Sequence, residues 1–129
     1  MKNIITAVVL SLLSFLCSAQ TNISNWSSAS DDNIVVKRLA GDTLTSSFLI
    51  QVRNDVPLHY HAYHSEHVYV LSGEGEFVLN SDTSIVSSGT YTFIPSESWH
   101  MVKVISDEPL RVLSIQSPEF LGKDRVKGP

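Results

Sequence analysis

The chain has 129 residues, with 9 Lys and Arg against 13 Asp and Glu, a formal net charge of −4 and a single cysteine. This length suits one domain, and the acidic balance argues against nucleic acid as a partner, because proteins that bind nucleic acid cluster Lys and Arg. One cysteine excludes an intramolecular disulfide and a sulfur-rich metal site.

Residues 1–19 predict a secretory signal peptide, because a lysine precedes an apolar run (residues 4–16) and small residues close the stretch. The run is shorter than the roughly 20 residues that span a bilayer, so a permanent anchor is the weaker alternative. Cleavage is expected after Ala19, which gives a periplasmic or secreted protein without membrane contact. Lipidation of Cys17 is a minor alternative, since the bulky Leu16 precedes it.

Residues 20–31 are rich in Ser and Asn and are expected to form a flexible leading segment. From residue 33 onward, short β-branched and aromatic runs alternate with turn-forming residues, which predicts eight strands and no long helix. The runs lie at residues 33–40, 43–53, 67–73, 75–80, 83–89, 90–95, 100–106 and 110–116. This spacing indicates an antiparallel sandwich or barrel.

Two connecting segments carry further expectations. The glycines of SGEGE, Gly73 and Gly75, predict a hairpin turn between the third and fourth runs. Residues 122–129 are expected to be a polar C-terminal tail that frays after Phe120 and Leu121 pack.

Four of the five histidines lie within HYHAYHSEH, residues 59–67. His59 and His61 share one face of a strand, because strand side chains alternate. Left without hydrogen-bond partners in an apolar interior, each imidazole would cost about 1–3 kcal/mol. A bound metal removes this cost, and the same alternation allows Glu66 to face inward with Val68 and Val70.

Two segments together resemble the motifs of the cupin family. HYHAYHSEHVYVLSG has the form HxH, four residues, Glu, six residues, Gly, and GTYTFIPSESWH has the form Gly, five residues, Pro, four residues, His. The likeness covers about residues 32–116. It implies an all-β fold, a cupin jelly-roll β-barrel (double-stranded β-helix) over residues 32–121. The resemblance also implies the metal ligands, which are His59, His61, Glu66 and His100.

The departures from the cupin motifs leave the substrate class open. Glu97 stands where the second motif has glycine, and we interpret it as a solvated loop carboxylate, with a position at the cavity mouth as the alternative. His64 and His67 do not share the face of the ligand pair, so we interpret them as residues at the rim or supporting the ligands. Phe93 is expected to line the cavity together with the valines that follow Glu66.

Three imidazoles and one carboxylate suit Fe, Mn, Ni, Co or Zn, and offer too few oxygens for Ca. The leading hypothesis is a metal-dependent enzyme, a dioxygenase, isomerase or lyase acting on a small metabolite, with Glu66 as the catalytic proton acceptor. The alternatives are a noncatalytic module that binds a small sugar or organic acid, and a domain in which the metal is only structural. The unperturbed imidazole pKa of about 6.5 predicts weaker metal binding below that pH. A homodimer is expected from the resemblance alone.

Overall fold

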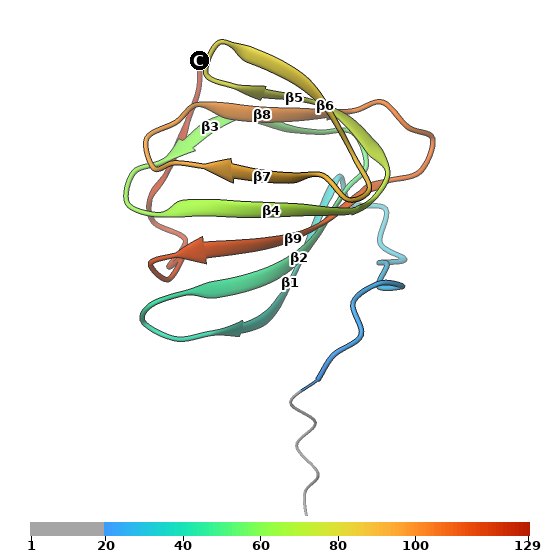
Figure 1. Cartoon of the computed structure of the whole chain (residues 1–129), viewed down its shortest axis with the longest axis horizontal. Coiled ribbons are helices and arrows are strands. Elements are labelled where there is room, and N and C mark those ends of the chain that lie inside the picture. The colour runs from blue at the N-terminus through green and yellow to red at the C-terminus, as the bar shows by residue number, and fades with distance from the viewer. Residues whose placement is uncertain (1–19) are drawn as a thin grey trace, which may run out of the picture.

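The computed structural model describes residues 20–129. Its strands form two β-sheets that pack against each other (Figure 1). The predicted signal peptide, residues 1–19, lies outside the described residues. The strands are β1 (Ile34–Gly41), β2 (Ser46–Val52), β3 (Asp55–His61), β4 (Ser65–Ser72), β5 (Glu74–Leu79), β6 (Asp82–Ser87), β7 (Tyr91–Ile94), β8 (His100–Val104), β9 (Leu110–Ser117) and β10 (Arg125–Lys127). No segment of the described chain forms a helix long and apolar enough to cross a membrane.

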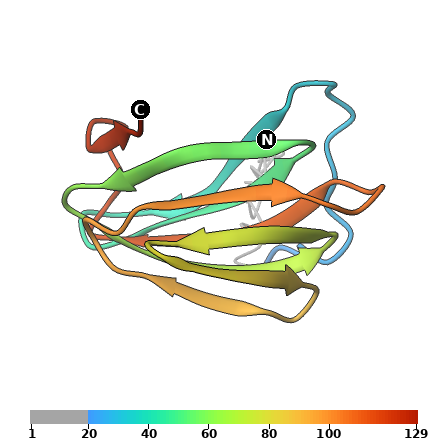
Figure 2. The same cartoon turned by 90° about the horizontal axis from the view of Figure 1, so that it is seen from above.

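The two five-stranded sheets face each other as the layers of a jelly roll (Figure 2). One sheet has the order β1-β2-β9-β4-β7 and the other has the order β10-β3-β8-β5-β6, and all pairings between neighbouring strands are antiparallel. The all-β prediction is therefore confirmed. Besides the eight apolar runs, the structure has β3, where the spacing of His59 and His61 indicated a strand, and β10, which was not expected.

The inward-facing side chains change from polar to apolar along the length of the barrel. On β4 the inward row runs from Glu66 through Val68 to Val70, as the alternation predicts. The neighbouring β9 row runs alongside it from Gln116, which pairs with Glu66, to Leu110. One end of the interior is therefore polar and the other is apolar.

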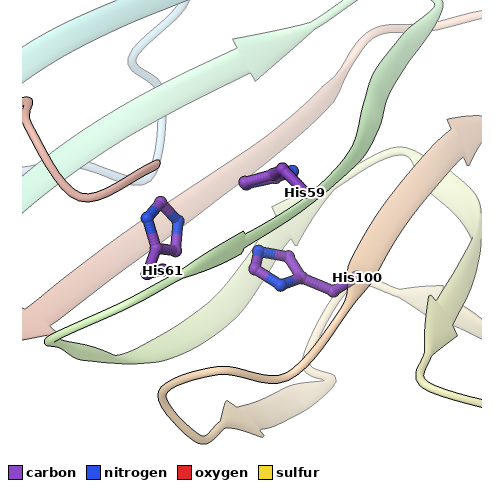
Figure 3. A group of neighbouring side chains, drawn as sticks. All are labelled: His59, His61 and His100. Atoms are coloured by element: carbon purple, nitrogen blue, oxygen red, sulfur yellow. The ribbon is translucent and has the colours of Figure 1, made fainter. Parts of the chain in front are cut away.

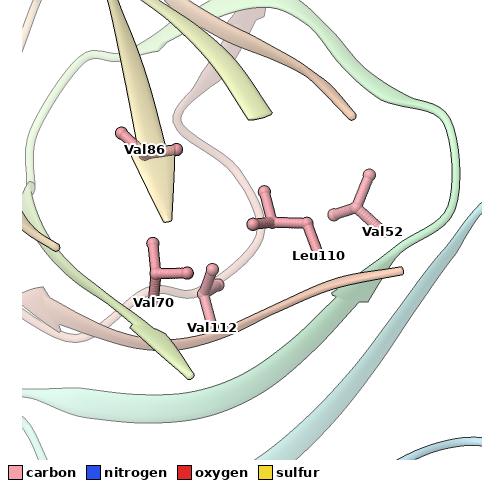
Figure 4. Close-up of a cluster of buried hydrophobic side chains, with 5 residues drawn as sticks. All are labelled: Val52, Val70, Val86, Leu110 and Val112. Carbon is pink, nitrogen blue, oxygen red and sulfur yellow. The ribbon is translucent and has the colours of Figure 1, made fainter. Parts of the chain in front are cut away.

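The apolar end holds the main hydrophobic cluster (Figure 4). Each of its side chains is at most 7% exposed, and burying a Val or Leu side chain contributes about 1.5–3 kcal/mol. The members are Val52, Val70, Val86, Leu110 and Val112. Since this cluster contains no polar group, the barrel has a core that does not depend on the polar end.

The turn at Gly73 connects the two sheets and is not the expected hairpin, because β4 and β5 belong to different sheets. Gly73 has a φ of 79°, in the left-handed region that favours glycine. A Cβ there would also lie 2.7 Å from the carbonyl oxygen of Pro109. Both the backbone angle and the close approach therefore require glycine where the chain crosses between sheets.

We expect Gly73→Ala to lower the free energy of unfolding by about 2 kcal/mol, because backbone strain and a backbone clash act together. Gly89→Ala is the control, since Gly89 has a φ of 90° but a Cβ added there would have no neighbouring atom within 4 Å. Strain alone should cost that variant about 1 kcal/mol. Urea unfolding measures both, and equal losses would show that the contact with Pro109 has no energetic effect.

Residues 20–31, predicted to be flexible, make specific contacts with the first sheet. The backbone N–H of Ser28 donates to Oε1 of Gln51 (3.0 Å), and Nε2 of Gln51 donates to the Ser28 carbonyl (3.1 Å). Further along, the guanidinium of Arg53 donates to the carbonyl of Ser30. These bonds place the leading segment against the barrel.

The C-terminal tail differs most from expectation, because its residues 125–127 form a strand, β10. In β10, Arg125 pairs with His61 of β3 in antiparallel register. The residue before the strand, Asp124, is only 8% exposed, and its carbonyl accepts a hydrogen bond from the N–H of Ala62 (2.9 Å). The tail therefore closes the polar end of the barrel beside the histidines.

Candidate metal centre

Three imidazoles meet at the polar end of the barrel (Figure 3). His59 and His61 come from β3, and His100 is the first residue of β8. The three residues are 5%, 6% and 4% exposed, and ligand nitrogens of all three lie within 4.8 Å of one another. The structure therefore brings together the three histidines named by the sequence, although they are up to 41 residues apart.

Backbone carbonyls determine which ring nitrogen is free in two of these histidines. Nδ1 of His59 lies 2.8 Å from the carbonyl oxygen of Pro57, and Nδ1 of His100 lies 2.9 Å from that of Ser98. A carbonyl can only accept, so both Nδ1 atoms carry the proton. The lone pair is then on Nε2, the arrangement in which backbone bonds orient metal-binding histidines.

Burial keeps the imidazoles neutral. Burial and, to a lesser extent, the neighbouring histidines lower the pKa of His59 and of His61 from 6.5 to about 3. Burial also lowers the pKa of His100, partly opposed by its hydrogen bond to Ser98 and by the Glu66 carboxylate. Only a neutral imidazole binds a metal. Because burial already keeps these three histidines neutral, they are in the protonation state that metal binding requires.

Glu66 supplies the only carboxylate that lines the cavity within the described residues. Its Oε2 lies 3.8 Å from Nε2 of His61 and 3.7 Å from Nε2 of His100. Its Oε1 accepts hydrogen bonds from the hydroxyl of Ser114 (2.5 Å) and from Nε2 of Gln116 (3.3 Å). These two β9 residues hold one oxygen and leave the other directed at the imidazoles.

The donor set fits a divalent transition metal. Nε2 of His100 is buried without a hydrogen-bond partner among residues 20–129, a condition that a protein rarely tolerates unless another ligand satisfies the atom. Three neutral nitrogens and one carboxylate oxygen suit Fe, Mn, Ni, Co or Zn. The buried histidine cluster is thus able to hold a metal.

A cavity of about 170 Å³ adjoins the cluster and has mainly apolar walls. Val68 and Val70 line it, as the alternation along β4 predicts. The same expectation for Phe93 is wrong, because its side chain is 46% exposed and pairs with His67 on the outer face of the sheet. The residues on either side of Phe93 in β7, Thr92 and Ile94, line the cavity instead.

Asp124 is a site residue that the sequence did not identify. Its Oδ2 accepts hydrogen bonds from Nδ1 of His64 (2.7 Å) and from the backbone N–H groups of Tyr63 and His64, and its Oδ1 lies 3.8 Å from Nδ1 of His61. Burial opposes ionisation, but the Tyr63 N–H and the neighbouring imidazoles outweigh it and hold the pKa of Asp124 below 3.8. In the sequence, Asp124 is a single aspartate in a polar tail, and no motif spacing relates it to the histidines.

The remaining polar residues of the two motifs lie outside the cluster. His64 is 2% exposed and therefore does not lie at the rim; its ring centre lies 4.0 Å from that of His61, and with His61 and Asp124 it forms a second group of side chains that could hold a metal ion. His67 lies on the outer face, where Nδ1 contacts the Tyr91 hydroxyl (2.6 Å). Glu97 is exposed, as expected, and has a φ of 62°, which explains why glycine is common at this motif position.

Comparison with known sequences identifies one family over more than half of the chain. The family described as "Cupin domain" matches residues 47–116. An uncharacterised protein of Aquifex aeolicus is 33% identical over 96 residues, which are 74% of this chain and 78% of that protein. A mannose-1-phosphate guanylyltransferase of Escherichia coli is 35% identical over 66 residues, but the match covers 51% of this chain and only 14% of that enzyme.

Solved structures share the fold at low sequence identity. KdgF from Halomonas sp. superposes with a TM-score of 0.66 at 21% identity, covering 76% of this chain and 89% of that one. Pac13 of Streptomyces, described as a nucleoside dehydratase, superposes with a TM-score of 0.61 at 16% identity, covering 72% and 84%. At these identities the likeness concerns the fold alone.

Proposed function

The chain belongs to the cupin family, and on that premise we propose that it is a metal-dependent enzyme acting on a small metabolite in the periplasm or outside the cell. His59, His61, Glu66 and His100 would hold one divalent transition metal. The observation that carries this proposal is the position of the cluster. Its free nitrogens and the Oε2 of Glu66 meet beside a cavity of about 170 Å³, whereas a purely structural metal needs no adjoining space.

The walls of the cavity would bind and dehydrate a substrate. Apolar side chains from both sheets surround the space, and a site of this kind favours a small organic molecule over water. When bound, the metal would act as a Lewis acid that polarises a substrate oxygen, and redox-active iron would add oxygen chemistry. Isomerase, lyase and dioxygenase reactions all fall within this range.

Glu66 would transfer the proton. Its Oε1 is occupied by Ser114 and Gln116, so Oε2 would serve both roles: it would bind the metal in the resting site, and it would have to leave the metal to accept a proton from a substrate held in the cavity. The hydroxyl of Ser114 would keep its hydrogen bond to Oε1 in both roles. No other carboxylate lines this cavity in the described chain, so proton transfer depends on Glu66.

A cobalt-loaded sample tests whether the centre has open coordination positions. We expect small hydroxy acids or catechols to change the visible spectrum of the wild-type protein. Glu66→Gln should weaken metal retention, by roughly tenfold or more on the scale known for residues around metal sites, and should abolish turnover. Glu97→Gln is the matched control, because this exposed carboxylate lies outside the cluster, and it should behave as wild type.

The outcomes separate the candidate roles. A cobalt spectrum that does not respond to any such compound would contradict an active site and indicate a structural metal. A response to ligands without turnover of any candidate substrate would indicate a noncatalytic binding module.

A further inference from the structure

Arg125 is placed to contact whatever occupies the cavity. Its backbone pairs with His61, and because residues directly opposite each other in a sheet share a face, its side chain leaves β10 on the side of the histidines. Arg125 lines the cavity and is at the same time exposed to solvent. The Arg125 side chain therefore lies between the cavity and solvent.

Arg125 is also the one arginine in residues 20–129 whose guanidinium has no hydrogen-bond or ion-pair partner. The other three are satisfied within the protein: Arg38 by Glu119 at 3.0 Å, Arg53 by the Ser30 carbonyl, and Arg111 by the Ser72 hydroxyl at 2.6 Å. A guanidinium has five donors in a planar fork that matches a carboxylate. Here that fork is left free at a cavity.

The charge of Arg125 acts on the same space as the histidines. Burial lowers the pKa of Arg125 and the Glu66 carboxylate raises it, while the positive charge of Arg125 contributes to the lowered pKa values of His59 and His100. Lys127, two residues along β10 and opposite His59, lies on the same face. In a chain of net charge −4, this strand forms a local positive edge beside the cavity.

We propose that Arg125 is a substrate-binding residue that anchors the carboxylate of a small organic acid, with the apolar part of the acid inside the cavity. This inference rests on the proposed function and specifies its substrate class. One free guanidinium satisfies a carboxylate through two parallel hydrogen bonds. A phosphate monoester, with its larger charge and third free oxygen, would be left incompletely paired, and the nearby Glu66 would repel it more strongly.

Binding of matched probes tests the inference directly. Benzoate and benzamide have the same ring and differ in charge, and phenyl phosphate supplies the alternative anion. Dissociation constants would be measured by titration calorimetry or ligand-observed NMR for wild type, Arg125→Gln and Arg125→Lys. Lys37→Gln is the control, because it removes one positive charge from β1, and Lys37 pairs with Leu49 away from the cavity.

We expect Arg125→Gln to weaken benzoate binding by about tenfold or more, the scale of hydrogen bonds to charged groups, and to leave benzamide unchanged. Arg125→Lys should lose part of the affinity, and Lys37→Gln none. All variants should keep the wild-type melting temperature, because the Arg125 side chain has no partner within residues 20–129. Equal benzoate affinity in wild type and Arg125→Gln would overturn the proposal, and so would a preference for phenyl phosphate that depends on Arg125.

Repeating the titrations after metal removal distinguishes this inference from the proposed function. The difference between wild type and Arg125→Gln should persist without metal, because the guanidinium is not a ligand. A protein that binds no metal but still selects benzoate through Arg125 would refute the metal-dependent enzyme and support the anion site. If the protein binds metal but Arg125→Gln does not change its affinity for benzoate, the anion site would be refuted and the metal-dependent enzyme would be supported.

Discussion

His61→Ala should remove most of the stability that a bound metal gives. At a free metal concentration of 100 times the dissociation constant, binding stabilises the wild-type fold by about 2.7 kcal/mol, which corresponds to a rise in melting temperature of about 10 °C for a domain of this size. Supporting residues around metal sites alone contribute about 10- to 100-fold in affinity. A loss of about 100-fold on removal of a ligand would leave a stabilisation of only about 0.4 kcal/mol at the same metal concentration.

His67→Ala is the matched control for this experiment. It removes an imidazole from the same nine-residue stretch, but His67 lies on the outer face of the sheet, where it contacts Tyr91. Its metal-induced shift in melting temperature should equal that of wild type. If His61→Ala showed an undiminished shift, His61 would not be a ligand. Because the apolar cluster at the other end of the barrel contains no metal-binding group, both variants should fold.

The metal-free protein should lose stability steadily between pH 6.5 and about pH 3. His59 and His61 have a folded pKa of about 3 against 6.5 in the unfolded chain. Over that window the unfolded chain binds more protons than the folded protein, so the free energy of unfolding falls as the pH falls. Each imidazole contributes a slope of up to about 1.4 kcal/mol per pH unit, and the full stabilisation is present above pH 6.5.

Melting temperatures of metal-free protein at pH 7, 6, 5 and 4 measure this slope. His61→Ala should melt with a shallower dependence on pH than wild type, because one of the shifted groups is removed. The same pKa values change the expectation for the metal. Since burial delays protonation of the ligands, the wild-type protein should retain metal at pH 5, where an unperturbed imidazole pKa of about 6.5 would predict release. A melting temperature that is constant from pH 7 to 4 would contradict the neutral, buried state of these imidazoles.

The inward direction of His59, His61 and Glu66 could be predicted from the sequence because strand alternation is a local signal, whereas His100 was assigned through the resemblance to the second cupin motif. The two-residue spacing of His59 and His61 places both on one strand face, and the alternation along β4 directs Glu66, Val68 and Val70 inward. Alternating apolar runs likewise identified an all-β fold. The alternation failed in β7, where no residue of known orientation shows which positions face inward. There Phe93 lies outside and Ile94 lies inside.

The missing strands have a different cause. β3 contains a proline and two histidines within seven residues, and β10 has three residues in a charged tail, so neither has the apolar alternation that marks a strand. Their hydrogen bonds to neighbouring strands, and not their composition, make them strands. The turn at Gly73 was misjudged for the same reason, since the pairing of β4 with β7 and β9 is a long-range property.

By itself, the sequence determined the strand-rich fold class, because strand periodicity acts over a few residues, and its resemblance to the cupin motifs implied the three histidines and the carboxylate. The tertiary structure alone decided which polar groups surround them. Ser114, Gln116, Asp124 and Arg125 follow the ligands in the chain by up to 66 residues and have no motif of their own. The pairing of β9 with β4 and of β10 with β3 brings them to the site. Burial in that assembled interior, which no local pattern encodes, lowers the imidazole pKa values, and the pairing of β10 with β3 places Arg125 at the cavity.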